Sequence, residues 1–492
     1  MGALKQKLKD QLSLTAGLPS TDPTLSFWQE PPASIATAQS ETLPSVTDIV
    51  IIGSGVTGTS VANTLLNHPQ TSGLQVTILE ARNTCSGATG RNGGHLVSDT
   101  YGYFKQLVDA LGLEEATKIL QFSEANIAEL KTVVAQLDKS EQDAVELREV
   151  NATTVAADQE TLNDLKRSFE FANDMVSKTT LEYELIEDQK RIQNLYQYRH
   201  GLAVFGQRGA AALWPYRLIT VLLRRLLITH HSRFSIETNT PVTAISYQQD
   251  TAQSGHNYLL HTPRGPIRAQ KIIHCTNGYS SHLLPKLTGK LYPLRGTCSL
   301  QDPGLAFPRI GNKYSWTKVH KGHYNPETTV LTTGLYYAQQ SAKSGEIVIG
   351  GESQELKNLL TSDDSQVAPT AADHISSVVP KMYLGADNVK VKKVWSGIMG
   401  FTADGLPLVG NLGPVTTGRA GDQEWIAAGF NGHGMDKCWL SGQAVARLAM
   451  GEDTPLWFPE SFLVSEERLK SLTIDCATDT IVSMFGLSSS KL

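Results

Sequence analysis

The stretch Asp48-Ile-Val-Ile-Ile-Gly-Ser-Gly-Val-Thr-Gly58 decides the fold of this chain. Its β-branched run, residues 49–52, predicts a strand that is buried in a parallel sheet. The strand leads directly into a turn with the spacing Gly-x-Gly-x-x-Gly. Gly53 allows the tight turn, Gly55 lets a pyrophosphate approach the backbone, and Gly58 lets the next helix pack closely against the strand.

The residues after this turn complete the pattern of a dinucleotide-binding unit. Residues 61–66 predict a helix, whose N-terminus offers unpaired N–H groups and a partial positive charge to phosphates. A second strand, predicted at 74–79, ends in Glu80, which can accept hydrogen bonds from a ribose diol. A lone glycine motif is weak evidence for a nucleotide site. Here both strands and the acid also stand in the order and at the spacing that the dinucleotide-binding unit requires. The residues predicted to contact the nucleotide in this unit are Gly53, Ser54, Gly55, Val56, Thr57, Gly58 and Glu80.

Length, charge and cysteine content narrow the class of protein. The 492 residues are enough for two or three domains or for one large discontinuous pair. A content of 40% hydrophobic and 18% charged residues fits a soluble globular enzyme, and the net charge of −5 argues against nucleic acid as a partner. The five cysteines are widely spaced and form no Cys-x-x-Cys pair, so we expect no disulfide framework and no metal site.

The two ends of the chain differ in their targeting signals. No apolar run is long enough to span a membrane, and the N-terminus lacks the pattern of a secretory signal. The sequence ends in Ser490-Lys491-Leu492, which is the address read by the peroxisomal import receptor. We therefore expect that receptor as a partner and the peroxisome as the location, with the cytoplasm as the alternative.

The order of predicted elements indicates an α/β fold, α+β overall, made of two interleaved domains. One is a Rossmann-like nucleotide-binding domain, and the other is a substrate domain built on a mostly antiparallel sheet. A Pro/Ser/Thr-rich arm, expected to lie on the surface, precedes them, and residues 441–450 predict the final helix. The predicted ranges are 1–44 for the arm, 45–140, 213–287 and 387–470 for the nucleotide-binding domain, 141–212 and 288–386 for the substrate domain, and 471–492 for the tail.

Two further glycine-rich loops extend the predicted site. Residues 81–95 follow the acid directly and contain many small residues, whose free N–H groups can lie along a flat polar ring system. Residues 425–434 again predict a strand, a glycine loop and the start of a helix. The N-terminus of that helix can stabilise negative charge on a bound ring.

Taken together, these segments resemble the D-amino-acid-oxidase-like superfamily of FAD-dependent oxidoreductases. Among its members the chain looks most similar to the branch with γ-glutamylputrescine oxidase and fungal amine oxidase-like proteins. The motifs that carry the resemblance are Gly53-Ser-Gly-Val-Thr-Gly58, Glu80-Ala-Arg82, Ala88-Thr-Gly-Arg-Asn-Gly-Gly94, Asn239-Thr-Pro-Val242, Cys275-Thr-Asn-Gly-Tyr279, Pro293-Leu-Arg-Gly296, Gly400-Phe-Thr-Ala-Asp-Gly-Leu-Pro-Leu-Val-Gly410 and Gly429-Phe-Asn-Gly-His-Gly434.

The resemblance implies FAD as the cofactor and assigns a part of it to each loop. Glu80 binds the adenosine ribose, Arg82 lies beside the adenine, and Val242 contacts the adenine through its backbone. The segment from Arg91 to Gly94 passes along the flavin, and residues 432–434 approach its pyrimidine edge. The further cofactor residues that it implies are Ala81, Gly87, Ala88, Thr89, Arg91, Asn92, Gly93, Gly94, Gly432, His433 and Gly434.

The resemblance also implies a reaction, in which a hydride passes from the carbon next to an amine nitrogen to flavin N5. The imine then hydrolyses, and oxygen reoxidises the flavin to give hydrogen peroxide. The candidate catalytic residues are His95, which ends the flavin loop, Tyr337, which is one of two adjacent tyrosines facing opposite sides of a strand, and Trp395. For His95 a structural hydrogen bond is the alternative, and for Trp395 it is core packing.

The sequence is also compatible with three other functions. The chain can be an FAD dehydrogenase that passes electrons to a carrier, a tailoring enzyme of secondary metabolism, or a protein that keeps FAD for structure alone. Two departures from monomeric sarcosine oxidases bear on this choice. The resemblance aligns Met399 with the cysteine that tethers FAD in those enzymes, and it aligns the region of Val348 with their oxygen-activating lysine. The sequence does not name the substrate.

Overall fold

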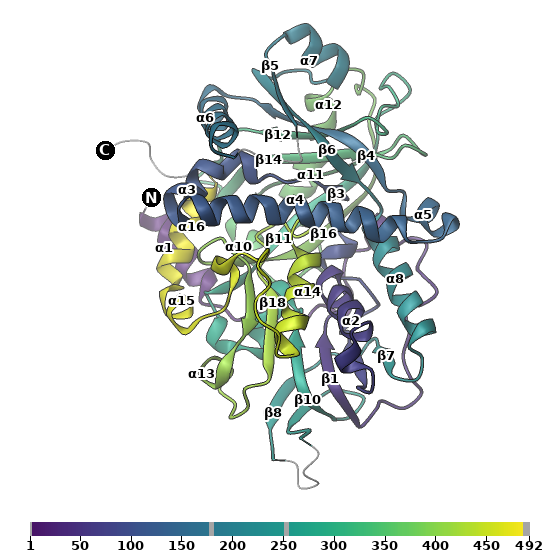
Figure 1. Ribbon diagram of the computed structural model, residues 1–492. Coiled ribbons are helices and arrows are strands. Elements are labelled where there is room, and N and C mark those ends of the chain that lie inside the picture. The colour runs from purple at the N-terminus through teal and green to yellow at the C-terminus, as the bar shows by residue number, and fades with distance from the viewer. Residues whose placement is uncertain (1, 177–181, 250–254, 486–492) are drawn as a thin grey trace.

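The structure is a computed structural model, and it describes residues 2–176, 182–249 and 255–485. The chain forms two sheets, with sheet A in the lower half of Figure 1 and sheet B in the upper half. The long helix α4 (Leu113–Ala135) crosses the molecule between these halves. The predicted peroxisomal address, Ser490-Lys491-Leu492, lies outside the described residues and stays a prediction.

Sheet A has a parallel core, in which β1 (Val46–Ile52) pairs with β10 on one side and with β2 on the other. The strand order is β17-β18-β10-β1-β2-β7, and among the described strands only β17 at one edge and the β8–β9 extension from β10 run antiparallel to their neighbours. The other strands are β2 (Val76–Leu79), β7 (Phe234–Glu237), β8 (Ala244–Tyr247), β9 (Tyr258–His261), β10 (Ile267–His274), β17 (Leu408–Asn411) and β18 (Glu424–Ala428).

The central position of β1 follows from its sequence. Residues 49–52 are buried, as an apolar run with neighbours on both sides and layers on both faces requires. Helix α2 (Val56–Leu66) starts immediately after the glycine turn, five residues before the predicted apolar pattern. A Cβ atom on Gly58 would lie 2.0 Å from the carbonyl oxygen of Gly53, so only glycine allows the helix to fold back so tightly.

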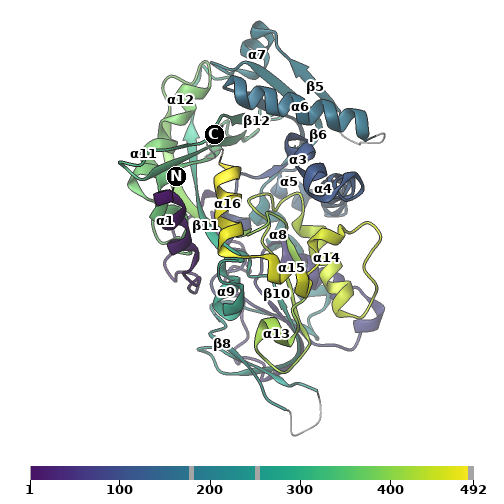
Figure 2. The ribbon, with the colours of Figure 1, turned by 90° about the vertical axis from the view of Figure 1, so that its left-hand side faces the viewer.

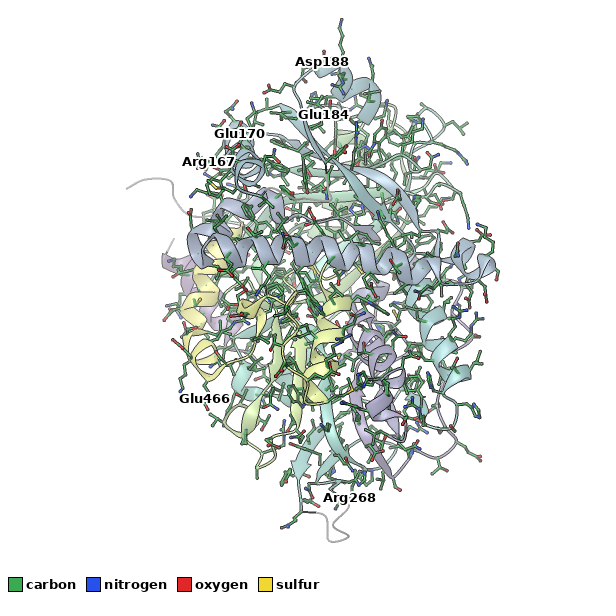
Figure 3. The ribbon with its side chains drawn as sticks, viewed as in Figure 1. Arg167, Glu170, Glu184, Asp188, Arg268 and Glu466 are labelled. Atoms are coloured by element: carbon green, nitrogen blue, oxygen red, sulfur yellow. The ribbon has the colours of Figure 1, made fainter. Side chains whose placement is uncertain are left out.

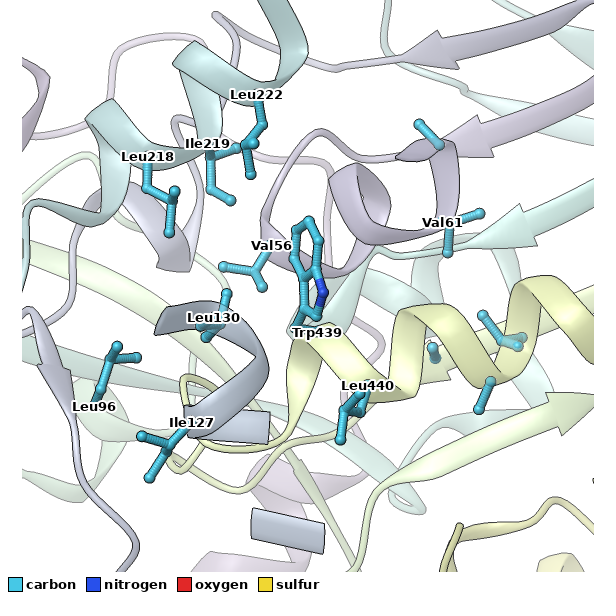
Figure 4. Packing of buried hydrophobic residues seen from close by; sticks show 14 of the residues in the cluster. Val56, Val61, Leu96, Ile127, Leu130, Leu218, Ile219, Leu222, Trp439 and Leu440 are labelled. Atoms are coloured by element: carbon cyan, nitrogen blue, oxygen red, sulfur yellow. The ribbon is translucent and has the colours of Figure 1, made fainter. Parts of the chain in front are cut away.

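Three helices and a strand bury their apolar side chains around α2 (Figure 4). Helix α14 (Cys438–Ala449) packs closest, because a Cβ on its Gly442 would lie 2.6 Å from the Cβ of Ser60 on α2. Helix α4 and helix α8 (Pro215–Thr229) add apolar faces, and α8 begins at a proline, which is favoured in the first turn. The labelled core residues are Val56, Val61, Leu96, Ile127, Leu130, Leu218, Ile219, Leu222, Trp439 and Leu440.

Sheet B is mostly antiparallel, as expected, and has the order β16-β11-β15-β14-β12-β4-β6-β3. Its only parallel pair among the described strands is β12–β4. The longest pairing joins β11 (Leu291–Asp302) to β16 (Lys390–Thr402). The other strands are β3 (His95–Leu96), β4 (Arg148–Ala156), β5 (Tyr183–Ile186), β6 (Ala203–Ala212), β12 (Tyr314–Val319), β13 (His323–Tyr324), β14 (Val330–Gln340) and β15 (Ile347–Glu355).

The predicted fold class is confirmed, with one parallel-core sheet and one antiparallel sheet interleaved along the chain. Two strands of sheet B, β3 and β16, nevertheless come from ranges that were assigned to the nucleotide-binding domain. β3 follows the glycine loop after β2 of sheet A, and β16 is followed along the chain by β17 of sheet A, so the chain changes sheet inside those ranges. The exact domain boundaries therefore stay predictions.

The remaining helices lie around the two sheets. Helix α6 (Gln159–Met175) is capped by Asp158, because the Asp158 side chain accepts a hydrogen bond from the Thr161 backbone N–H at 2.9 Å. Charged side chains such as Arg167, Glu170, Glu184, Asp188, Arg268 and Glu466 lie at the periphery of the molecule (Figure 3). The other helices are α3 (Phe104–Leu111), α5 (Lys139–Val145), α7 (Gln189–Tyr196), α9 (Ser280–Leu283), α10 (Leu356–Leu359), α11 (Pro369–Ser376), α12 (Val378–Met382), α13 (Gly413–Thr417) and α15 (Glu466–Ser471).

The two ends of the described chain pack against each other (Figure 2). Helix α1 (Gly2–Leu12) buries Leu4, Leu8 and Leu12, and α16 (Ile474–Met484) buries its own apolar face. Two ion pairs join these helices, Lys5–Asp479 at 2.7 Å and Lys9–Asp475 at 2.5 Å. The prediction that residues 441–450 form the final helix is wrong, because α15 and α16 follow. Short amphipathic helices of this kind depend on tertiary partners, which the local pattern does not reveal.

None of the helices in the described ranges is both long enough and apolar enough to cross a membrane.

We predict that Leu8→Ala lowers the free energy of unfolding by about 2–4 kcal/mol, because it leaves a cavity where α1 meets the core. Leu8 is fully buried, whereas Lys7 on the same helix is exposed. Denaturant unfolding of the purified variant measures the change, and Lys7→Ala is the matched control. An equally small effect of both substitutions would show that α1 is not part of the cooperative core.

Candidate functional site

A cavity of about 420 Å³ lies between the two sheets. On one side it is lined by the segments that follow the carboxyl ends of β1, β2, β10 and β18, which is where open parallel sheets bind their ligands. On the other side it is lined by every second residue of strands in sheet B, since alternate side chains share a face. These residues include Leu294, Gly296 and Cys298 of β11, Thr333, Leu335 and Tyr337 of β14, and Gly397, Met399 and Phe401 of β16.

The glycine turn after β1 forms a cradle at the sheet A end of the cavity. Gly53 has a φ of +108°, and a Cβ there would lie 2.7 Å from the Cys275 carbonyl oxygen. Gly55 occupies the N-cap of α2 without a side chain to cap the helix. The first helical bond runs from Thr59 N–H to Gly55 O at 2.9 Å, so the N–H groups of the first turn have no partner within the helix. This arrangement fits a pyrophosphate.

Glu80 is held at the end of β2 with its carboxylate toward the cavity. It accepts hydrogen bonds from Ser54 N–H at 3.1 Å, from the Ser54 hydroxyl at 2.6 Å and from Arg82 N–H at 3.0 Å. A carboxylate has about four acceptor positions, so Glu80 retains capacity for a ribose hydroxyl. The cradle and this acid therefore fit the nucleotide half of FAD.

A buried charge cluster, which the sequence analysis missed, supports the loop after Glu80. Asp364 accepts hydrogen bonds from Arg82 at 2.9 Å, and its carboxylate lies 3.6 Å from Nε of Arg91. All three side chains are buried. Burial lowers the pKa of Arg91 to about 10, although the charge of Asp364 opposes the shift, so the guanidinium stays protonated at neutral pH. Asp364 comes from a loop between α10 and α11 that carries no local signal of a site.

Two indole rings hold the glycine loop that is predicted to pass along the flavin. Trp28 donates from Nε1 to the Asn92 carbonyl oxygen at 2.5 Å, and Trp395 donates to the Arg91 carbonyl oxygen at 2.8 Å. Trp28 is buried, which corrects the expectation that the N-terminal arm lies only on the surface. Trp395 is fully buried and is not among the residues that line the cavity, so it supports the loop from behind and is not a pocket wall.

The third glycine turn, at residues 432–434, lies at the start of α14. Asn431 fixes this turn to β16, because its side-chain oxygen accepts from Thr402 N–H at 2.8 Å and its N–H donates to Gly400 O at 2.9 Å. His433 lies 3.1 Å from Asp99, and the pair lines the cavity mouth beside the turn.

The wall on sheet B carries the titratable groups that are closest to the glycine loops. A Cβ on Gly93 would lie 2.7 Å from the Tyr337 ring, and His95 contacts the same ring edge-on at 6.1 Å between centroids. Burial lowers the pKa of His95 to about 4, so its imidazole is neutral at neutral pH, and its Nε2 has no hydrogen-bond partner among the described residues. The Tyr337 hydroxyl lies 3.6 Å from the Cys298 sulfur, and burial raises the pKa of both groups.

Glu352 is a buried acid on this wall, and no sequence pattern pointed to it. It lies on β15 and accepts hydrogen bonds from Thr297 N–H and from Gln354 Nε2, the latter at 2.6 Å. Burial raises the pKa of Glu352 to about 8, although these hydrogen bonds and the charge of Arg295 oppose the shift. A buried strand residue of this type is visible only once the face that it shares with the cavity is known.

Most of the predicted site residues come together around the cavity. Of the predicted set, Gly58, Gly94 and Trp395 do not line it. Gly58 permits the tight turn described above, and Gly94 adopts a φ of +73°. The predicted residues that line the cavity are Gly53, Ser54, Gly55, Val56, Thr57, Glu80, Ala81, Arg82, Gly87, Ala88, Thr89, Arg91, Asn92, Gly93, His95, Val242, Tyr337, Gly432, His433 and Gly434.

A glycine cradle, an acid suited to a ribose and two further glycine loops on one cavity are the features of a dinucleotide-dependent oxidoreductase. Residues 48–448 match the family described as "DAO: FAD dependent oxidoreductase". The match covers most of the chain, so the protein belongs to this family, and its cofactor is FAD.

Similar proteins agree with the family and with the fold. The chain is 23% identical to the probable oxidoreductase OrdL of Rhizobium meliloti over 410 residues, which covers 83% of this chain and 84% of the relative. Its structure resembles glycine oxidase from Geobacillus kaustophilus with a TM-score of 0.62 and 18% identity, over 86% of this chain and 99% of that one. It also resembles L-proline dehydrogenase from P. horikoshii with a TM-score of 0.61 and 17% identity, over 85% and 98% of the two chains. The γ-glutamylputrescine oxidase branch stays a prediction.

We predict that Gly55→Ala weakens FAD binding by roughly tenfold or more, equivalent to about 1.4 kcal/mol. The added methyl group would fill the cradle and lie 2.9 Å from the Thr89 hydroxyl oxygen. Fluorescence titration of the apoprotein with FAD measures the dissociation constant. Gly73→Ala serves as the control, because a Cβ there meets nothing within 4 Å and lies outside the cavity.

We predict that Asp364→Asn lowers the free energy of unfolding by about 3–5 kcal/mol, since it leaves two buried guanidinium groups without their carboxylate. Asp363→Asn is the matched control on a half-buried neighbour. Thermal and denaturant unfolding of both variants provide the comparison. Equal stability of the two variants would contradict a structural role for the charge cluster.

Proposed function

We propose that this protein is an oxidase that removes a hydride from the carbon next to the nitrogen of an amine or amino-acid-like substrate. The observation that carries the proposal is a single cavity that joins the dinucleotide cradle of sheet A to the enclosed wall of sheet B. Solved structures of similar fold include a glycine oxidase, an L-amino acid deaminase and an iminodiacetate oxidase, which supports a substrate with a C–N bond.

The residues of the chain would contribute orientation, exclusion of water and electrostatic stabilisation. Bound FAD supplies the hydride acceptor. We expect the turn at 432–434 and the start of α14, which follows at Cys438, to face the flavin ring, so that their backbone N–H groups and the helix N-terminus stabilise developing negative charge. Tyr337 and the neutral imidazole of His95 enclose the wall on the side of Gly93.

A dehydrogenase that passes electrons to another acceptor is the second candidate. One of the similar structures is an L-proline dehydrogenase, and it covers nearly the same share of this chain as the glycine oxidase does. Both candidates require the same cavity, so the electron acceptor separates them.

We expect anaerobic addition of a suitable amine or amino acid to bleach the absorbance of the FAD-loaded protein. Readmission of oxygen should restore the absorbance and release one hydrogen peroxide for each substrate oxidised. A screen of amines, D- and L-amino acids and N-methyl amino acids, read by absorbance and by a peroxide assay, measures both steps. Reduction that oxygen does not reverse would favour the dehydrogenase, and reduction by hydroxy acids alone would contradict both candidates.

A further inference from the structure

The wall of the cavity on sheet B carries one buried acid among the described lining residues, Glu352 of β15. A Cβ on Gly296 would lie 3.9 Å from the Glu352 Oε1 and 2.9 Å from the methyl group of Met399. Met399 in turn has its sulfur 3.8 Å from a Cβ placed on Gly432. The Met399 side chain therefore lies close both to the Glu352 carboxyl and to the turn at 432–434, which precedes α14.

The same acid is connected to the opposite loop through Tyr337. The Tyr337 ring would touch a Cβ on Gly93 at 2.7 Å, and the charge of Glu352 contributes to the raised pKa of the Tyr337 phenol. Glu352 and Tyr337 both line the cavity. The carboxyl therefore lies on the part of the wall that is framed by both predicted flavin loops.

Among the described residues of sheet B that line the cavity, no arginine or lysine balances this acid. The only arginines among the described lining residues are Arg82 and Arg91, which belong to the loop after β2. Their guanidinium groups hydrogen-bond to Asp364 and to backbone carbonyls, and one nitrogen of each has no partner among the described residues. Arg295, whose charge acts on Glu352, is not among the lining residues and donates instead to the Asp363 carbonyl oxygen at 3.1 Å. The described part of the sheet B wall is therefore suited to a cation and carries no arginine or lysine to pair with a carboxylate.

We infer that Glu352 receives the amine of the substrate, and that the substrate is a cationic amine without a carboxylate on the reacting carbon. The carboxylate binds the ammonium group and takes one proton from it. One N–H bond breaks and one O–H bond forms, so the amine becomes neutral and its nitrogen lone pair is free to assist departure of the hydride. This inference rests on the proposed function and adds a substrate class and a proton acceptor to it.

The protonation state of Glu352 gives binding a distinct pH dependence. With a pKa of about 8, the carboxyl of the ligand-free cavity is largely protonated at neutral pH, so binding of an ammonium ion releases one proton. Apparent affinity should rise about tenfold per pH unit up to about pH 8, and fall once the free amine loses its own proton near pH 10. The charged or titratable groups that act on Glu352 are Arg295 and Cys298 of β11 and Tyr336 and Tyr337 of β14.

The test uses matched pairs of probes on the FAD-loaded protein. Each amine is compared with the amino acid that adds only an α-carboxylate, n-pentylamine with norleucine and benzylamine with phenylglycine. We expect the amines to bind and to reduce the flavin, and Glu352→Gln to weaken amine binding by about 10- to 150-fold through loss of a charge-assisted hydrogen bond. Glu355→Gln is the control, because Glu355 lies on the same strand, bonds to Thr370 at 2.8 Å and does not line the cavity.

Calorimetric titration provides a readout that does not depend on turnover. Measured in buffers of different ionisation enthalpy at pH 7, binding of n-pentylamine should release about one proton in the unaltered protein and none in Glu352→Gln. A purely structural role of Glu352 would leave the proton count and the preference for amines unchanged in the variant. Stronger binding or faster reduction with the amino acids would overturn the inference while leaving the proposed function intact. Failure of every probe to bind would overturn the inference, and reduction by hydroxy acids alone would overturn both.

Discussion

The structure depends on the convergence of several strand ends at one edge of a parallel sheet. Strands β1, β2, β10 and β18 all run in the same direction, so the segments that follow them meet on one side of sheet A. The contact that makes this possible is the approach of Gly58 to the Gly53 carbonyl, because it lets α2 start directly above β1. A side chain at Gly58 would push the helix away and separate its N-terminus from the cavity.

Buried polar contacts then fix the loops that a parallel sheet alone would leave mobile. Asp364 holds Arg82 and Arg91 in a region closed to solvent, and the carbonyls of residues 91 and 92 accept from two indoles. Each of these groups would be costly to bury without a partner. The geometry of the cofactor loop is therefore set by residues that come from the arm, from the β15–β16 connection and from β16 itself.

Sheet B closes the cavity and determines its chemistry. Its strands present alternate residues to one face, which brings Tyr337, Cys298 and Glu352 together although they are far apart in sequence. Gly350 and Gly351 leave room for the rings of Tyr337 and Tyr336, since Cβ atoms there would lie 2.3 Å from these rings. Burial in this wall raises the pKa of Glu352 to about 8 and lowers that of His95 to about 4, so both side chains are mostly neutral at neutral pH.

The sequence by itself determined the nucleotide-binding unit, because strand, glycine turn, helix and acid are contiguous and each depends on local geometry. It also placed Tyr336 and Tyr337 on opposite faces of one strand, since side chains alternate along a strand. Only the tertiary structure revealed Asp364 and Glu352, and only it showed that Trp395 packs behind the loop that it supports. These roles depend on which strand neighbours which, and pairing between distant strands leaves no periodic signal in a single sequence.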